Sequence, residues 1–127
     1  MQNNHIAGIG VDMLEIHRIQ KLFQRFQMRL ANRFLNQNEM IRFKEIQNEN
    51  KKINFLAKNF CAKEAFLKAL GTGLRKPYNF NNIEIMHDAL GKPFFIFHGE
   101  PQKIFKNAHL SLTDTANIVT AFVILEH

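Results

Sequence analysis

The sequence predicts a single α+β domain in which a mostly antiparallel sheet packs against a long central helix. Its 127 residues suit one hydrophobic core, and its 13 phenylalanines are expected to form much of that core. Residues 54–73 carry apolar side chains at helical spacing and then reach glycine. Short strands are predicted at residues 6–14, 83–87, 94–98, 109–113 and 118–125. The resulting order, strand, helices, strands, short helix, strands, is typical of an α+β fold, and we take residues 1–127 as one domain.

The first predicted strand opens with two glycines, which leaves one of its faces nearly bare. Strand alternation divides its side chains into two sets: Gly8, Gly10 and Asp12 on one face, Ile9 and Val11 on the other. The bare face beside Asp12 allows close approach of another group. A dinucleotide-binding loop would need a third glycine that opens a helix, and none follows. Taken alone, Asp12 is either a helix-capping or turn residue, the simpler interpretation, or a metal ligand.

Residues 15–30 have a helical period and a basic stripe. Their apolar face is formed by Ile19, Leu22, Phe23, Phe26 and Leu30. The stripe beside it consists of Arg18, Lys21, Arg25 and Arg29. No acidic residue lies within one turn along the stripe to relieve the repulsion among these cations. The stripe is either an ordinary solvated face or a docking surface for an acidic partner, and we favour docking.

The central helix is apolar but carries ionisable residues. Lys63 falls inside its apolar stripe, Glu64 lies beside Lys63, and Lys68 follows one turn after Glu64. Such groups are costly to bury without partners. The helix therefore contains either a functional site or a structural ion pair, and the pattern alone leaves both open. Cys61 is expected to be an inert buried thiol.

The remaining segments predict short elements. Asn36 or Asn38 is expected to cap a short helix that runs through residue 46. A polar loop is expected at 47–52, turns and loops at 71–82, a hairpin from the strands at 83–87 and 94–98, and a short helix at 99–107. In the strand at 109–113, His109 shares a face with Ser111 and Thr113. The run at 118–125 is nearly all apolar, which predicts a central strand covered on both faces.

The net charge of +6 and a pI near 9.7 favour an anionic partner. Nucleic acid, a phosphorylated small molecule, an acidic protein and a membrane surface all fit that charge. One tyrosine and no tryptophan disfavour nucleic acid, because few aromatic rings are available for stacking on bases. No apolar run approaches the ~20 residues of a membrane span, and no secretory signal opens the chain. We therefore expect a cytoplasmic protein that binds neither nucleic acid nor a membrane.

Two acidic residues far apart in the sequence would form a metal site if the fold brings them together. Asp12 lies near the end of the first strand, and Glu64 lies on the helix expected to cross the sheet. Mg²⁺ commonly takes one or two carboxylates together with substrate phosphates. Lys63 and Lys68 would then offer cations to the same phosphates. The hypothesis is a Mg²⁺ site for a phosphorylated substrate, provided that the fold joins these residues.

Four segments, taken in order, resemble the signatures of holo-acyl-carrier-protein synthase, the small bacterial class of phosphopantetheinyl transferases. The segments are GIGVDMLEIHRI, FLAKNFCAKEAFLKALGTG, ALGKPFF and HLSLTDTANIVTAFVILE. The most specific positions are Gly10, Asp12, Arg18 and Ile19, and the run from Phe60 to Gly73. The resemblance extends over nearly the whole chain, and it implies the fold of that family.

The resemblance also implies a reaction. This family transfers the 4′-phosphopantetheine arm of coenzyme A to a serine of apo-acyl carrier protein and releases adenosine 3′,5′-bisphosphate, a step that supports fatty acid biosynthesis. A base, either Glu64 or a water on the metal, takes the serine proton. The family is usually a homotrimer with sites shared between subunits. The alternatives are the same chemistry on a carrier domain of secondary metabolism, or a basic, non-catalytic binding module for acidic partners.

Residue by residue, the resemblance assigns roles to the positions that match. Asp12 and Glu64 match the ligands of Mg²⁺, with Mn²⁺ as the alternative ion, and Lys68 joins them as the third catalytic residue. The residues expected near coenzyme A are Lys63, Lys68, Gly71, His109, Phe55 and Lys58. Those expected to dock the carrier protein are Arg18, Arg25 and Arg29. Asn59 stands where some members have an arginine that helps hold the nucleotide, and the expected substitute is either Lys58 or the pair Lys51 and Lys52.

Overall fold

The computed structural model describes residues 5–71, 78–99 and 104–127, and its elements follow the predicted order except for the short helix expected at 99–107. The elements are β1 (Ile6–Glu15), α1 (Ile16–Phe26), α2 (Met28–Phe34), α3 (Gln37–Glu45), α4 (Glu49–Leu70), the 3₁₀ helix η1 (Phe80–Asn82), β2 (Ile83–His87), β3 (Pro93–Phe97), β4 (Asn107–Asp114) and β5 (Ile118–Glu126). None of the helices in these ranges combines the length and apolarity that a membrane crossing needs.

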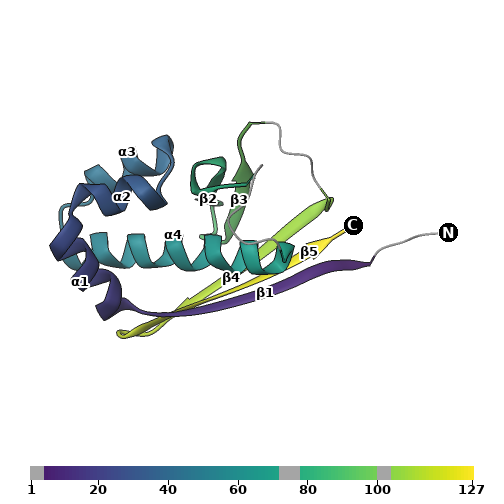
Figure 1. Ribbon diagram of the computed structural model, residues 1–127, viewed down its shortest axis with the longest axis horizontal. Helices are drawn as coiled ribbons and strands as arrows, with labels where there is room; N and C mark the ends of the chain where they lie inside the picture. Colours follow the sequence, from purple (N-terminus) through teal and green to yellow (C-terminus); the bar gives the residue numbers. More distant parts are fainter. Residues whose placement is uncertain (1–4, 72–77, 100–103) are drawn as a thin grey trace.

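The described strands form two antiparallel sheets. One has three strands in the order β1-β5-β4, and the other is the β2–β3 hairpin. Figure 1 shows α4 lying along the three-stranded sheet. Helices α1 and α2 lie near the N-terminal half of α4, and the β2–β3 hairpin lies near its C-terminal half. The predicted antiparallel packing on a central helix is therefore confirmed, although the hairpin forms a sheet of its own.

The bare face of β1 is where α4 approaches. A Cβ atom added to Gly8 would lie 1.9 Å from the carbonyl oxygen of Ala69, and one added to Gly10 would lie 1.9 Å from that of Ala65. Only glycine allows a strand backbone and a helix backbone to come this close. Asp12 shares the face of these two glycines, so its side chain points toward α4.

The core lies between α4 and the two sheets and is rich in aromatic rings. Phe66 of α4 is fully buried, and its ring lies within 5.7 Å of four others: Tyr78, Phe95, Phe97 and Phe105. Ring pairs at these separations pack edge-to-face or tilted, which adds to the stabilisation from burial. The prediction of a core built on phenylalanine is confirmed.

Two helix predictions need correction. The single helix expected at 15–30 is broken at Gln27, whose φ of 51° is unusual for a residue other than glycine, so α1 and α2 are separate. The polar loop expected at 47–52 is shorter, because Asn48 caps α4 by accepting from the backbone N–H of Lys51. Of the two candidate caps, Asn36 and Asn38, it is Asn36 that caps α3, in a capping box completed by Glu39.

Two predictions in the C-terminal part also change. Residues 99 and 104–106 are not helical, and residues 100–103 of the predicted helix lie outside the described residues. Residues 72–77 of the predicted turn region also lie outside them. Strand β5 is central, as predicted, but within this chain it is covered on one face only. Val119, Ala121, Val123 and Leu125 are buried, whereas Phe122 on the other face is 41% exposed.

Candidate active site

Asp12, Glu64 and Lys68 come together where β1 meets α4. The ammonium of Lys68 donates to Asp12 Oδ1 at 2.9 Å and to the carbonyl oxygen of Val11 at 3.1 Å. Lys68 is more than half exposed, whereas Asp12 is mostly buried. Strand alternation turns Asp12 toward the helix, and helical spacing sets Glu64 one turn before Lys68. The site therefore offers two carboxylates and a cation that a ligand can reach.

The two carboxylates influence each other electrostatically. Burial raises the pKa of Glu64, the negative charge of Asp12 raises it further, and Lys68 opposes both. Within the described residues, no side chain donates a hydrogen bond to the Glu64 carboxylate. Placing a cation between two such carboxylates relieves their repulsion and provides Glu64 with a partner. In residues 5–71, 78–99 and 104–127 no group of three or more His, Cys, Asp or Glu residues is placed to hold a metal ion.

The other ionisable groups of this region are Lys68 and Cys61. The hydrogen bond to Asp12, and then the charge of Asp12, raise the pKa of Lys68, so it stays an ammonium at neutral pH. Burial, followed by the charge of Asp12, raises the pKa of the Cys61 thiol to about 12. Its sulfur lies 3.3 Å from the carbonyl oxygen of Asp12. Cys61 is therefore an inert packing residue, as the sequence predicts.

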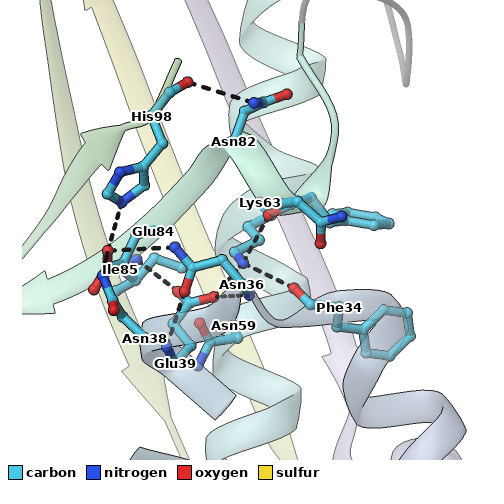
Figure 2. A network of polar contacts seen from close by, with 12 residues as sticks. Phe34, Asn36, Asn38, Glu39, Asn59, Lys63, Asn82, Glu84, Ile85 and His98 are labelled. Atoms are coloured by element: carbon cyan, nitrogen blue, oxygen red, sulfur yellow. Dashed lines mark hydrogen bonds and ion pairs between the residues drawn. The ribbon is translucent and has the colours of Figure 1, made fainter. Parts of the chain in front are cut away.

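Lys63 does not belong to this cluster, although it was predicted to contact coenzyme A. Its side chain is 0% exposed, and its ammonium binds Glu39 Oε1 at 2.5 Å and the carbonyl oxygens of Phe34 and Phe80 at 2.8 and 3.1 Å (Figure 2). An ammonium has three N–H donors, so none is left for a phosphate. One helical residue turns 100°, which directs Lys63 toward α3 while Glu64 faces β1. Of the two interpretations left open, the structural ion pair describes Lys63.

A second buried acid, Glu84, extends this network, and the sequence did not indicate it. Its carboxylate accepts hydrogen bonds from Asn36, Asn38 and His98 (Figure 2) and from a fourth side chain, Arg42. Burial alone would raise the pKa of Glu84, but these bonds outweigh it and lower the pKa to about 2. Neighbouring backbone groups are also satisfied, since Ile85 donates its N–H to Glu39 Oε2 at 2.7 Å. The only local sequence signal was the pair Asn36 and Glu39 at capping-box spacing.

An apolar groove lies beside Arg25 and Arg29 of the basic stripe. The groove, of about 420 Å³, is lined by Leu22, Phe26, Arg29, Leu30, Arg33, Phe34 and Phe60. The break at Gln27 places Arg29 on α2, yet the guanidinium groups of Arg25 and Arg29 both lie over the Phe26 ring, at 5.1 and 5.7 Å. Arg18 is exposed on α1. The groove was not predicted, because its walls come from three separate helices.

His109 lies on the opposite face of the sheet from Asp12. It pairs with Ile124 of β5, which in turn pairs with Ile9 of β1, and its Nε2 lies 2.6 Å from Glu126 Oε1. This outer face also exposes apolar side chains: Ile9 is 55%, Val11 52% and Met13 67% exposed. Within one chain, His109 and the Asp12–Glu64–Lys68 cluster therefore do not share a cavity.

The remaining predicted residues are distributed along α4. Lys58 forms a half-exposed ion pair with Asp114 at 3.6 Å. Gly71 ends α4 with φ of 78°, in the left-handed conformation that favours glycine. Phe55 is partly buried, with its ring 6.0 Å from that of Phe43. Asn59 is buried, donates to the carbonyl of Phe55 and leaves its own Oδ1 without a partner among the described residues.

Residues 8–123 match the model of the 4′-phosphopantetheinyl transferase superfamily, which is most of the chain. This chain belongs to that superfamily. Its relatives include a holo-[acyl-carrier-protein] synthase from Nitrosospira multiformis, which is 43% identical over 126 residues and is aligned over 95% of this chain and 98% of the relative. The alignment thus includes the segments that carried the resemblance, and the two chains have nearly the same length.

Solved structures of the superfamily have the same fold. The holo-[acyl-carrier-protein] synthase from Neisseria meningitidis superposes with a TM-score of 0.86 at 38% identity, over 97% of this chain and 100% of that one. The enzyme from Bacillus anthracis, solved in complex with CoA (3′,5′-ADP), has a TM-score of 0.81 at 36% identity, over 95% and 96% of the two chains. The predicted α+β phosphopantetheinyl transferase fold is confirmed.

Proposed function

We propose that this protein transfers the 4′-phosphopantetheine group of coenzyme A to a serine of apo-acyl carrier protein, with adenosine 3′,5′-bisphosphate as the second product. The observation that carries the proposal is the meeting of Asp12, Glu64 and Lys68 at the β1–α4 contact. Attack on a pyrophosphate needs groups that position its oxygens and neutralise their charge, and this cluster offers both. Relatives named holo-[acyl-carrier-protein] synthase support the choice of substrates.

Asp12 and Glu64 are the residues that would hold a Mg²⁺ ion. The fit rests on the partly buried Glu64 carboxylate, which has no hydrogen-bond partner among the described residues and whose pKa is raised by burial and by Asp12. Two carboxylates with open positions for phosphate oxygens suit Mg²⁺, and Mn²⁺ takes similar ligands. When bound, such an ion supplies Lewis-acid chemistry to the pyrophosphate.

The side chains of this chain then act as follows. Lys68 is exposed enough to turn its ammonium from Asp12 to a phosphate oxygen, where it stabilises the charge that develops on the leaving group. The base that takes the serine proton stays either Glu64, whose pKa is raised by burial and by Asp12 when no ion is bound, or a water. Lys58, His109, Gly71 and Phe55 stay proposed contacts for the rest of coenzyme A. Lys63 is removed from that set because its three donors are already used.

The carrier protein docks on α1 and α2. Arg25 and Arg29 supply positive charge at the apolar groove and Arg18 supplies it on the exposed surface of α1, which suits an acidic helix with apolar residues on one face. Charges at the rim of such an interface mainly guide association, whereas the apolar groove holds the bound partner.

The active enzyme is proposed to be a homotrimer assembled through the outer face of the three-stranded sheet. Ile9, Val11, Met13 and Phe122 are all more than 40% exposed there, and a contiguous apolar surface of this kind marks an interface. His109 lies on the same face, so assembly would carry it toward the site of a neighbouring copy. Light scattering after gel filtration tests the assembly, and a monomer at micromolar concentration would contradict it.

The test of the reaction is intact-mass spectrometry of an apo-acyl carrier protein incubated with this protein, coenzyme A and Mg²⁺. The expected result is a mass gain equal to one phosphopantetheine, which disappears when EDTA is added. No gain with several carrier proteins, from folded enzyme and with added Mn²⁺, would overturn the proposal. Carrier binding without transfer would then favour a non-catalytic module for acidic partners.

A further inference from the structure

We infer that Lys63 is a positioning residue, which holds the docking groove at a set distance from the Asp12–Glu64–Lys68 cluster. The inference rests on the proposed function, because it assigns roles to the groove and to the cluster. It starts from the three acceptors of the Lys63 ammonium, which come from three segments outside α4. Figure 2 shows Phe34 and Glu39 close to the Lys63 side chain.

One of those acceptors belongs to the wall of the groove. The carbonyl oxygen of Phe34 accepts a hydrogen bond from the Lys63 ammonium at 2.8 Å. Phe34 also lines the groove together with Phe60, and the centres of their rings are 4.5 Å apart. Phe34 is the last residue of α2, where backbone carbonyls have no partner within their own helix. Lys63 therefore binds the end of the helix that carries Arg29.

The other two acceptors connect Lys63 to further segments. Glu39 receives Lys63 on Oε1 and the backbone N–H of Ile85 on Oε2, so α3 and β2 are held through one carboxylate. Phe80 adds η1, and its ring lies 5.7 Å from that of Phe34. All of these bonds originate one residue before Glu64 on α4. The geometry thus links the walls of the groove to the helix that presents the proposed metal ligand.

Stability alone does not explain a charged pair at this position. Apolar side chains of similar volume are often as stabilising as a buried ion pair. What the ammonium adds is directional hydrogen bonding. Its three hydrogen bonds favour one arrangement of α2, α3 and η1 around α4. Transfer requires the carrier serine and the phosphate to meet within reacting distance, and an error of about 1 Å can cost about 100-fold in rate.

The experiment compares Lys63→Met with Arg42→Met. Arg42 belongs to the same network, since it binds Glu84 Oε2 at 3.0 Å and the carbonyl of Ile85 at 3.0 Å, but these contacts join α3 to β2 and do not involve α4. Turnover is measured at saturating coenzyme A and carrier protein and is expressed per folded molecule, with the folded fraction from circular dichroism. The dissociation constant of coenzyme A is measured by calorimetry without carrier protein.

For Lys63→Met we expect kcat to fall at least tenfold, while the dissociation constant of coenzyme A changes less than twofold. For Arg42→Met we expect kcat within twofold of the unmodified protein. Equal kcat losses in both variants, in proportion to their loss of thermal stability, would show that Lys63 acts only on stability. If Lys63→Met does not fold, the double variant Lys63→Met/Glu39→Met removes the same connection without leaving an unpaired buried charge. Normal kcat in that variant overturns the inference.

A second arm does not depend on catalysis. Spin labels are attached to cysteines introduced at Asn32 on α2 and Ala116 in the β4–β5 turn, both exposed, and Cys61 is buried and stays unlabelled. Pulsed electron resonance should give a narrow distance distribution that broadens or shifts with Lys63→Met but not with Arg42→Met. An unchanged distribution refutes the positioning role. A changed distribution in a protein that transfers nothing means that the positioning is correct and the proposed reaction is not.

Discussion

Replacing Gly10 by alanine should separate the two halves of the active site. The added Cβ would lie 1.9 Å from the carbonyl oxygen of Ala65 and 2.6 Å from the backbone nitrogen of Ala69. Real Cβ contacts essentially never fall under 3.0 Å, so β1 and α4 must separate by about 3.0 minus 1.9, or 1.1 Å. The obstacle is helix backbone, which cannot rotate away as a flexible side chain does.

This displacement acts directly on the proposed chemistry. Gly10 and Asp12 lie on the same face of β1, and Ala65 directly follows Glu64 on α4. Moving the helix by about 1 Å therefore moves Glu64 and Lys68 away from Asp12. A misplacement of this size costs about 100-fold in turnover, and overpacking of this kind costs about 1–3 kcal/mol of stability.

The assay is the rate of phosphopantetheine transfer by intact-mass spectrometry, together with thermal unfolding. Gly99→Ala is the control for a glycine replacement without a backbone clash: unlike Gly10, Gly99 has a positive φ, 78°, and among the described residues its added Cβ would meet only Asn82 Nδ2 at 3.5 Å. The strain of that conformation should lower stability by about 1–2 kcal/mol and leave turnover unchanged. If Gly10→Ala keeps the turnover and melting temperature of the unmodified protein, the close β1–α4 contact is not what aligns the site.

Three further predictions follow from particular residues. The pKa of Glu84 is about 2 in the folded protein, against an ordinary value of 4.5. Between these two pH values the unfolded chain therefore binds more protons than the folded protein. About 3 kcal/mol of stability, present above pH 4.5, should be lost as the pH falls toward 2. Urea unfolding from pH 6 to pH 2.5 measures this loss, and Glu84→Gln should lack it; an equal slope in both proteins would contradict the assignment. Glu64→Ala should lower kcat by roughly 100-fold or more with the fold retained, and near-normal transfer would exclude it as a metal ligand. Arg25→Ala and Arg29→Ala should raise the KM for the carrier protein, an effect that added salt weakens; a rise in the KM for coenzyme A instead would place these arginines at another site.

The sequence by itself determined the features that depend on local periodicity and capping. Strand alternation placed Gly8, Gly10 and Asp12 on one face, and the capping residue Asn36 and the terminal Gly71 mark helix ends as predicted. These features follow from neighbouring residues only. The break at Gln27 was missed because glutamine at positive φ has no characteristic sequence signal.

The tertiary structure decided which charged residues meet. Lys63 and Glu64 are adjacent and carry the same kind of signal, a charge in an apolar helix. Lys63 is buried against Glu39, 24 residues away on α3, and Glu64 faces Asp12 on strand β1. Likewise, strand alternation placed His109 on one face of β4, but only the pairing with β5 and β1 shows that this face is opposite to Asp12. Side-chain direction follows from local geometry, whereas the partner in that direction depends on how distant segments pack, and this packing is set by the whole chain.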